Sequence, residues 1–460
     1  MTVESITPNG LKKSVLDSEY KTEYDENLDL LDENIGYLSA LARINLLSNS
    51  GFGAFSNSEG LYDTSTDALP VLGTGSDIIA NGTFATDTDW TKQTGWSISP
   101  GEGVASVVAG WNVIHQSIAT ILGQRYQVKY SVTMAGSGSI RSTFGTSKGA
   151  VRSATGIGTY TDVFIGTGGS VAIGIEGNGL TCNIDNVSCH KVMPGIISPT
   201  SSGPDGWENR NSAGIKIYQH YEAAKGTLYA VKLVTTQTNW NLRWPKNSTE
   251  LLLLAKYAGR TVTFGIWAKC SIANAVKLAI YDGSNTYSSY HTGSGNYELL
   301  TVTKAISPSA SEIQFQIDSQ SANTSYWRSP MLVIGTKISE ENYVPGEGVV
   351  HLEKPITLSN YNGAPVSANA TINLESESSG KMPKGCKAVK VRTTGTPTAT
   401  DKYLALKASS TGSEGPRIDS LIASKAHTSV AWCPVASDGT IQISTDGTFT
   451  TTIVISAIEV

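Results

Sequence analysis

The feature that most constrains the fold is a short motif that occurs twice near the start of the chain. Residues 45–55 read NLLSNSGFGAF, and residues 78–84 read IIANGTF. Both stretches place apolar residues before a polar step through Asn and Gly and then a Phe, a pattern typical of the opening strand of a β-domain. Too few residues separate the motifs for one domain to be completed before the next begins. We therefore expect the second domain to be inserted into the first.

The strand pattern that follows the second motif also returns later in the chain. Residues 116–192 alternate apolar and polar side chains between Gly-rich turns, as in half-buried antiparallel sheets. The second series of strands, after the inserted part, has no opening strand of its own. We predict that NLLSNSGFGAF supplies this opening strand. Three pairs of segments correspond: LLLLAKYAGRTVTFGIWAKC with QSIATILGQRYQVKYSVTM, EIQFQIDSQ with VAIGIEG, and TSYWRSPMLVIG with CNIDNVSCHKV.

These patterns predict a mainly β chain of nested β-sandwich domains of the jelly-roll type, preceded by a helix. Stretches dense in Pro, Gly and Ser flank the inserted part and are typical of linkers. In the last region two Asp-Gly pairs, Asp438-Gly439 and Asp446-Gly447, predict hairpins. The predicted parts are an N-terminal anchor and helix (1–44), an outer domain (45–70 plus 194–346), an inserted domain (75–193) and a C-terminal β-domain (347–460).

The N-terminal helix is predicted over residues 14–44. Ser14 and Asp17 resemble a capping box, and the apolar residues that follow have the 4-3-4-3-4 spacing of a coiled-coil seam. This spacing predicts a homo-oligomer; the alternative is that the stripe docks on the chain's own first β-domain. Asp25 and Asp32 flank the seam without basic partners, which leaves them free for a basic socket on another protein. The seam consists of Tyr24, Leu28, Leu31, Ile35, Leu38 and Ala42.

Composition excludes several classes of partner. Charged residues are 16% of the chain and the formal net charge is −5, so no basic field is available for nucleic acid or anionic membrane. The N-terminus lacks an apolar core of signal-peptide length, and no segment reaches the length of a membrane span. The five cysteines show no CxxC spacing and are expected to be buried free thiols. No cofactor and no metal are expected.

Catalytic motifs are not convincing in this sequence. Residues 145–149 read GTSKG and formally match G-x-S-x-G, but a nucleophile elbow requires a strand before it and a helix after it. The six histidines have no metal-ligand spacing, and carboxylates are sparse in the β-regions. We therefore expect no enzyme. A glycan depolymerase is kept as an alternative, because an acid/base pair could be assembled from distant positions or across subunits.

Aromatic residues are the better candidates for a binding site. Trp240 and Trp244 share strand parity and would leave the same side of a sheet, where indoles could stack on sugar rings. The alternative is that both fill the core. Trp267 has the opposite parity to its apolar neighbours and is the third candidate for glycan contact. Trp96 and Trp207, each beside a Gly, are expected in the core.

These motifs resemble two known groups of proteins. The N-G-x-F stretch from Asn81 to Phe84, Trp90 and Trp96 after it, and the closing IDNVS at residues 184–188 resemble jelly-roll carbohydrate-binding modules attached to xylanases. The nesting, with a Pro-rich return into DGW at residues 205–207, is similar to fibre or receptor-binding proteins of tailed bacteriophages. The resemblance covers residues 45–346.

The resemblance implies a virion protein, assembled in the host cytoplasm, that forms a homotrimer and holds another virion protein through residues 1–44. It also implies a bacterial surface glycan as ligand; the alternative is a head fibre or capsid decoration protein whose sandwiches are spacers. An exposed Trp240 and Trp244 pair would favour glycan recognition, and burial of both would favour the spacer. By the same resemblance Asp185 would neighbour a structural calcium, but no second carboxylate matches, so no metal is predicted.

Overall fold

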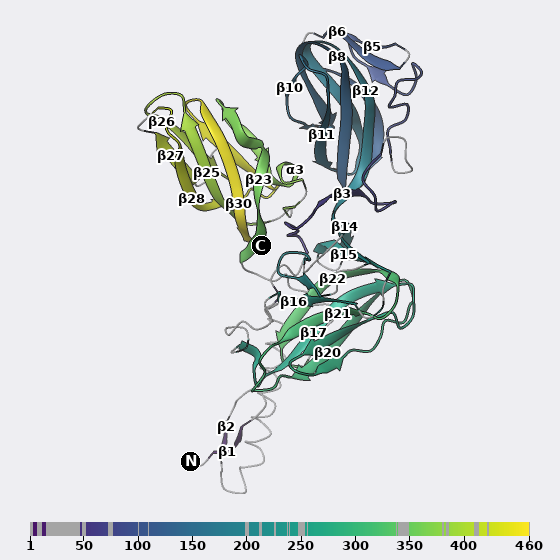
Figure 1. Ribbon diagram of the computed structural model, residues 1–460, viewed down its shortest axis with the longest axis vertical. Coiled ribbons are helices and arrows are strands. Elements are labelled where there is room, and N and C mark those ends of the chain that lie inside the picture. The colour runs from purple at the N-terminus through teal and green to yellow at the C-terminus, as the bar shows by residue number, and fades with distance from the viewer. Residues whose placement is uncertain are drawn as a thin grey trace.

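The structure is a computed structural model (Figure 1). It describes residues 3–6, 12–14, 47, 52–71, 77–99, 101–108, 110–197, 202–210, 214–224, 227–236, 238, 240–246, 254, 256–336, 338, 349–379, 381–382, 386–408, 414–420 and 423–459.

The described residues are mainly β, with several antiparallel sheets, which confirms the predicted class. At the N-terminus β1 (Val3–Ile6) pairs with β2 (Lys12–Ser14) in a two-stranded sheet that sequence reasoning missed. The predicted helix over 14–44 lies outside the described residues apart from Ser14, which closes β2. The six seam residues, Tyr24, Leu28, Leu31, Ile35, Leu38 and Ala42, also lie outside them.

Three β bodies follow, and Figure 1 shows them as three lobes. Each has its own cluster of buried apolar side chains. We call them the inner body (cluster between residues 79 and 189), the outer body (Leu47, Phe52 and Phe55 with residues between 196 and 332) and the terminal body (Ala54 with residues between 350 and 458).

The inner body is a sandwich in which two long strands run through both layers. In β12 the first part pairs with the end of β8 and with β7, and the second part pairs with the start of β8 and with β6. Positive φ at Gly179 and Asn186 accompanies the irregular register between the two parts. Its strands are β4 (Thr91–Lys92), β5 (Trp96–Ser99), β6 (Glu102–Val108), β7 (Asn112–Thr120), β8 (Arg125–Phe144), β9 (Ser147–Lys148), β10 (Arg152–Ser153), β11 (Gly158–Ile165) and β12 (Gly169–Ile196).

The outer body packs two sheets around the largest cluster. One sheet has the order β14-β15-β22-β17-β20 and continues from β12, and the other has the order β13-β16-β21-β18-β19. Its strands are β13 (Glu208–Asn209), β14 (Ile215–Ala224), β15 (Thr227–Thr235), β16 (Trp240–Trp244), β17 (Thr261–Cys270), β18 (Val276–Tyr281), β19 (Asn285–Tyr287), β20 (Tyr297–Ala305), β21 (Gln314–Ser319) and β22 (Asn323–Ile334).

The terminal body also has two sheets, in the orders β23-β30-β25-β28 and β24-β29-β26-β27. The strand β29 therefore lies in a different sheet from β28 and β30, so both predicted Asp-Gly hairpins are wrong: these turns are corners that carry the chain from one layer to the other. The elements are β23 (Val349–Val366), β24 (Ala370–Asn373), α3 (Leu374–Glu377), β25 (Ala388–Pro397), β26 (Lys402–Lys407), β27 (Glu414–Ser420), β28 (His427–Pro434), β29 (Thr440–Thr445) and β30 (Phe449–Glu459).

The second copy of the motif, residues 78–84, forms a turn rather than the expected opening strand, and residues 47 and 52–55 of the first copy lie in no strand. Phe52 and Phe84 occupy the same place in the motif, both have φ of 51°, and both are fully buried. Phe84 packs on Trp90 with ring centroids 4.9 Å apart, and Phe52 packs on Trp207 at 5.3 Å. The same Phe–Trp contact thus occurs in both bodies. In the inner body its two residues are close in sequence, whereas in the outer body the whole inserted segment lies between them in the sequence.

The two ends of the inner body lie side by side. The strand β3 (Gly60–Asp63) pairs with Val192–Gly195 of β12, and Asp77 forms a bridge with His190. Such closeness is what an insertion into a surface loop requires. All five cysteines are free and buried, as predicted. None of the helices within the described ranges has the length and apolar character needed to cross a bilayer.

Candidate functional site

The expected exposed pair of tryptophans is wrong. Trp240 and Trp244 are only 1% and 6% exposed and lie with Leu242 in the outer-body core. The shared parity along β16 was predicted correctly, but the apolar side faces the other sheet. Asn241 and Arg243 therefore point away from the core, because burial of three large apolar side chains outweighs any exposed arrangement.

The other tryptophans divide between core and sheet face. Trp96 and Trp207 are 6% and 0% exposed, which confirms the prediction that they fill cores. Trp267 lies on the face of β17 opposite to Phe264 and Ile266, which belong to the core cluster, and it is 7% exposed. None of the three proposed glycan-contact tryptophans presents an open ring face.

The outward face of the sheet that contains β16 is a more suitable site. Three adjacent strands place Asn241, Asp318 and Lys277 side by side in the register Asn241↔Asp318↔Lys277. Lys277 Nζ lies 3.6 Å from the ring centroid of Tyr287 and 4.8 Å from that of Tyr290. We call these five residues, together with Gln314 and Gln316, the outer polar face.

Asp318 dominates the electrostatics of the outer polar face. Its residue is 7% exposed, and its Oδ1 has no hydrogen-bond partner among the described residues. Burial raises the pKa of its carboxyl to about 6, although the positive charge of Lys277 acts in the opposite direction. The Oδ1 atom of Asn241 is likewise buried and without a hydrogen bond in the described part of the chain. Two acceptors thus lie next to each other without donors.

The rest of the face supplies orientation and aromatic surface. Gln316 Nε2 donates to Gln314 Oε1 at 2.7 Å, and Gln314 Nε2 donates to Glu312 Oε2 at 2.9 Å, which fixes both amides along β21. Tyr287 and Tyr290 are 47% and 38% exposed. Buried acceptors beside exposed aromatic rings are the groups that bind a ligand with hydroxyl donors and an apolar face.

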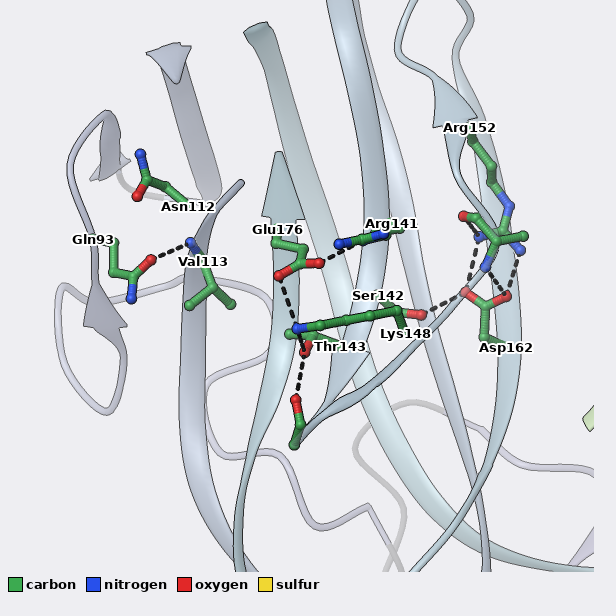
Figure 2. Close-up of polar contacts among 12 residues, drawn as sticks. Gln93, Asn112, Val113, Arg141, Ser142, Thr143, Lys148, Arg152, Asp162 and Glu176 are labelled. Atoms are coloured by element: carbon green, nitrogen blue, oxygen red, sulfur yellow. Dashed lines mark hydrogen bonds and ion pairs between the residues drawn. The ribbon is translucent and has the colours of Figure 1, made fainter. Parts of the chain in front are cut away.

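The inner body carries a related face, shown in Figure 2. Glu176 of β12 accepts from Arg141 Nε, and its other oxygen accepts from Lys148 Nζ at 3.0 Å. Lys148 also donates to Thr143 Oγ1 at 2.7 Å. The guanidinium of Arg141 lies 3.8 Å from the ring centroid of Trp111, which is 37% exposed.

A second ionic cluster lies beside this face. Arg152 donates through both terminal nitrogens to the Asp162 carboxylate, at 2.8 and 2.7 Å, and Ser142 donates to the same carboxylate (Figure 2). Bidentate geometry of this kind is strong and directional. Ser147 of the GTSKG stretch lies in the short strand β9, and the next element along the chain is the strand β10. The stretch therefore lacks the following helix that a nucleophile elbow requires.

The two faces occupy the same place in the repeat. In the matched segments VAIGIEG and EIQFQIDSQ, Glu176 aligns with Asp318, and each lies opposite a cation of the neighbouring strand, Arg141 or Lys277. The charge balance differs, because both oxygens of Glu176 are bound by cations, whereas no group in the described ranges donates to the buried Oδ1 of Asp318. Asp318 Oδ1 has no exposed surface of its own, so a ligand donor reaches it only when a side chain that covers it moves aside.

The acidic residue at this position could have been found from the sequence. Both repeats place it directly after an Ile in the central strand, which the alignment of the segments already displayed. Asp185, which the resemblance alone would place beside a structural calcium, accepts from Asn186 N at 2.6 Å and Asn186 Nδ2 at 3.0 Å. The described residues include no group of three or more His, Cys, Asp or Glu side chains arranged for a metal.

Comparison with known proteins gives little further identification. No protein-family model matches the chain, and no curated protein matches it. Solved structures similar to it include the tandem CBM22 domains of Xyn10C from Paenibacillus barcinonensis, with 11% identity over 58% of this chain and 100% of that chain and a TM-score of 0.23.

Two viral structures are also similar. The enzymatically active domain of tailspike protein 4 of bacteriophage CBA120 has 10% identity over 28% of this chain and 19% of its own, with a TM-score of 0.22. A chain of Sulfolobus Turreted Icosahedral Virus has 12% identity over 87% and 96%, with a TM-score of 0.16. Similarities at these TM-scores carry no argument about the fold or function of this chain.

Proposed function

We propose that this chain is a bacteriophage virion protein of the fibre or attachment type whose outer polar face recognises a bacterial surface glycan. The virion assignment rests on the sequence resemblance over residues 45–346. The glycan assignment rests on one observation, the buried carboxylate oxygen of Asp318 that receives no hydrogen bond from the described residues and lies beside the exposed rings of Tyr287 and Tyr290.

A sugar is complementary to this arrangement. Its C–H face can stack on a tyrosine ring, a contact that contributes about 1 kcal/mol beyond area burial. Once a covering side chain moves aside, one of its hydroxyls can donate to the buried Asp318 Oδ1, and a hydrogen bond to a charged group contributes about 1.5–3 kcal/mol. A single site of this kind binds weakly. Several copies in one virion raise the avidity by roughly 10²–10⁴ where the sites engage together.

We also propose that one domain of the chain is inserted into another. The outer domain consists of residues 45–70 and 194–346, the inserted domain of 75–193, and the C-terminal domain of 347–460. The three separate apolar clusters and the Phe52–Trp207 contact across the insertion support it. Residues 1–44 would form the homotrimer and hold another virion protein.

The test is binding of the intact protein to an array of bacterial surface glycans. The double variant Tyr287→Ala, Tyr290→Ala is expected to lose binding at least tenfold while its melting temperature stays unchanged. Trp432→Ala, which removes a similarly exposed ring from the terminal body, is the matched control and should bind normally. Full binding by the double variant would exclude the outer polar face.

A second candidate function is that of a spacer in a head fibre or capsid decoration protein. The burial of Trp240 and Trp244 favours it, because no indole is available there for stacking. The spacer is supported if the protein is incorporated into virions and binds no glycan on the array. Release of soluble oligosaccharides from a bound glycan would instead indicate a depolymerase.

A further inference from the structure

The three β bodies meet at one buried group of side chains. Arg125 begins β8 of the inner body, Tyr229 lies in β15 of the outer body, and Glu375 lies in α3 of the terminal body. Figure 1 shows α3 on the side of the terminal body that faces the inner body, above β14 and β15. Each body thus contributes one residue to the same point.

Glu375 contacts both of the other residues through the same oxygen. Arg125 Nε lies 2.8 Å from Glu375 Oε1, and the hydroxyl of Tyr229 donates to that oxygen at 3.3 Å. The guanidinium carbon of Arg125 lies 4.9 Å from the centroid of the Tyr229 ring. The side chains of Arg125 and Glu375 are 1% and 6% exposed, so both charges are removed from water.

Two further contacts join the bodies near this group. Ser376 Oγ donates to the carbonyl oxygen of Val163 in β11 at 2.8 Å, which joins the terminal and inner bodies directly. At Gly123, a Cβ would lie 2.3 Å from the hydroxyl of Tyr221 in β14, and the φ of +82° also excludes most side chains. The inner and outer bodies therefore touch directly where Gly123 meets the Tyr221 side chain.

We propose that Arg125, Tyr229 and Glu375 form an interbody lock that holds the three bodies in one fixed arrangement. A buried ion pair adds little net stability, because desolvation offsets the attraction, but an unpaired buried charge is strongly unfavourable. Any arrangement of the bodies in which Arg125 and Glu375 remain buried but no longer contact each other is therefore disfavoured. The lock selects one orientation rather than strengthening the contact in general.

This reasoning distinguishes the single variants from the double variant. In Glu375→Gln the charge of Arg125 stays buried without a counter-charge when the bodies are docked, whereas water solvates it when they separate. The equilibrium is expected to shift toward separated bodies by roughly 10²–10³-fold. In Arg125→Met, Glu375→Met both charges are absent, so docking returns. Tyr229→Phe removes only a hydroxyl and should have a smaller effect in the same direction.

The measurement is the distance distribution between spin labels on the inner and terminal bodies of the full chain. Cysteines introduced at Ala85 and Ala399, both exposed, accept the labels, since the native cysteines are buried. A single narrow distance is expected for the parent chain and for Glu377→Gln, a control in the same helix whose carboxylate binds Ser359 and Asn360 within the terminal body.

Broadening in Glu375→Gln with recovery in the double variant supports the lock. An unchanged distribution in Glu375→Gln and in Tyr229→Phe overturns it, and so does a double variant that stays as broad as the single one. Hydrogen exchange of the strands within each body, measured on the same samples, separates undocking from unfolding.

Discussion

The clearest quantitative prediction concerns the buried carboxyl of Asp318. Its pKa in the folded chain is raised from 3.8 to about 6 because burial disfavours the charged form. One pKa unit corresponds to about 1.4 kcal/mol, so ionised Asp318 lowers the stability of the folded state by about 3 kcal/mol relative to the neutral acid. This effect is absent well below the unfolded pKa of 3.8 and complete above the folded pKa.

The sign follows from proton binding. Between about pH 4 and 6 the folded chain holds a proton that the unfolded chain has lost, so this contribution to stability decreases as pH rises. Asp318→Asn resembles the neutral acid; its outer body should nearly equal the parent at pH 3 and exceed it by up to about 3 kcal/mol at pH 7.

The measurement is hydrogen exchange of β16, β18 and β21 in parent and variant across this range, taken as a difference so that other titrating groups cancel. Asp282→Asn is the control. Its carboxyl has a lowered pKa, because hydrogen bonds from Lys304 and from backbone amides outweigh desolvation, so this variant should lose stability at pH 7. A parent-minus-Asp318→Asn difference that does not change with pH would refute the reasoning.

Three further predictions follow from the fold and the N-terminal pattern. Trp207→Ala removes the partner of Phe52 from a fully buried site and should destabilise the outer body by about 3–5 kcal/mol, measured by chemical denaturation. Replacing residues 75–193 by a short Gly/Ser loop should leave the outer body folded, as judged by exchange protection of its strands; loss of that protection argues against an insertion. Changing Leu31 and Leu38 to Asp should lower the oligomeric state in sedimentation, and a parent chain that is already monomeric at micromolar concentration contradicts the seam.

Strand periodicity predicted which residues share a side but not which side faces the core. For Trp240 and Trp244 the parity was correct and the face was wrong. The apolar Leu242 between them, and the polar Asn241 and Arg243 on the other parity, already indicated that burial favours the indoles inside.

Other features depended on contacts that no local pattern contains. The Asp-Gly pairs predict tight turns correctly at the level of the backbone, yet whether the chain returns to its own sheet or crosses to the next depends on the whole sandwich. The free oxygen of Asp318 and the paired oxygens of Glu176 differ through side chains on neighbouring strands, so only the three-dimensional register separates a candidate site from a closed one.

The Phe–Trp contact that occurs in both bodies has a consequence for the order of folding. In the inner body Phe84 and Trp90 are neighbours in sequence, so the ribosome releases both almost together and the contact can form early. In the outer body Phe52 must wait for Trp207, which emerges only after the entire insertion. Once the insertion has folded and β3 has paired with β12, the ends of the connecting segment are held together, and the entropy of closing it falls to that of a short loop. We therefore expect the inner body to fold first during synthesis and to bring the two halves of the outer body together.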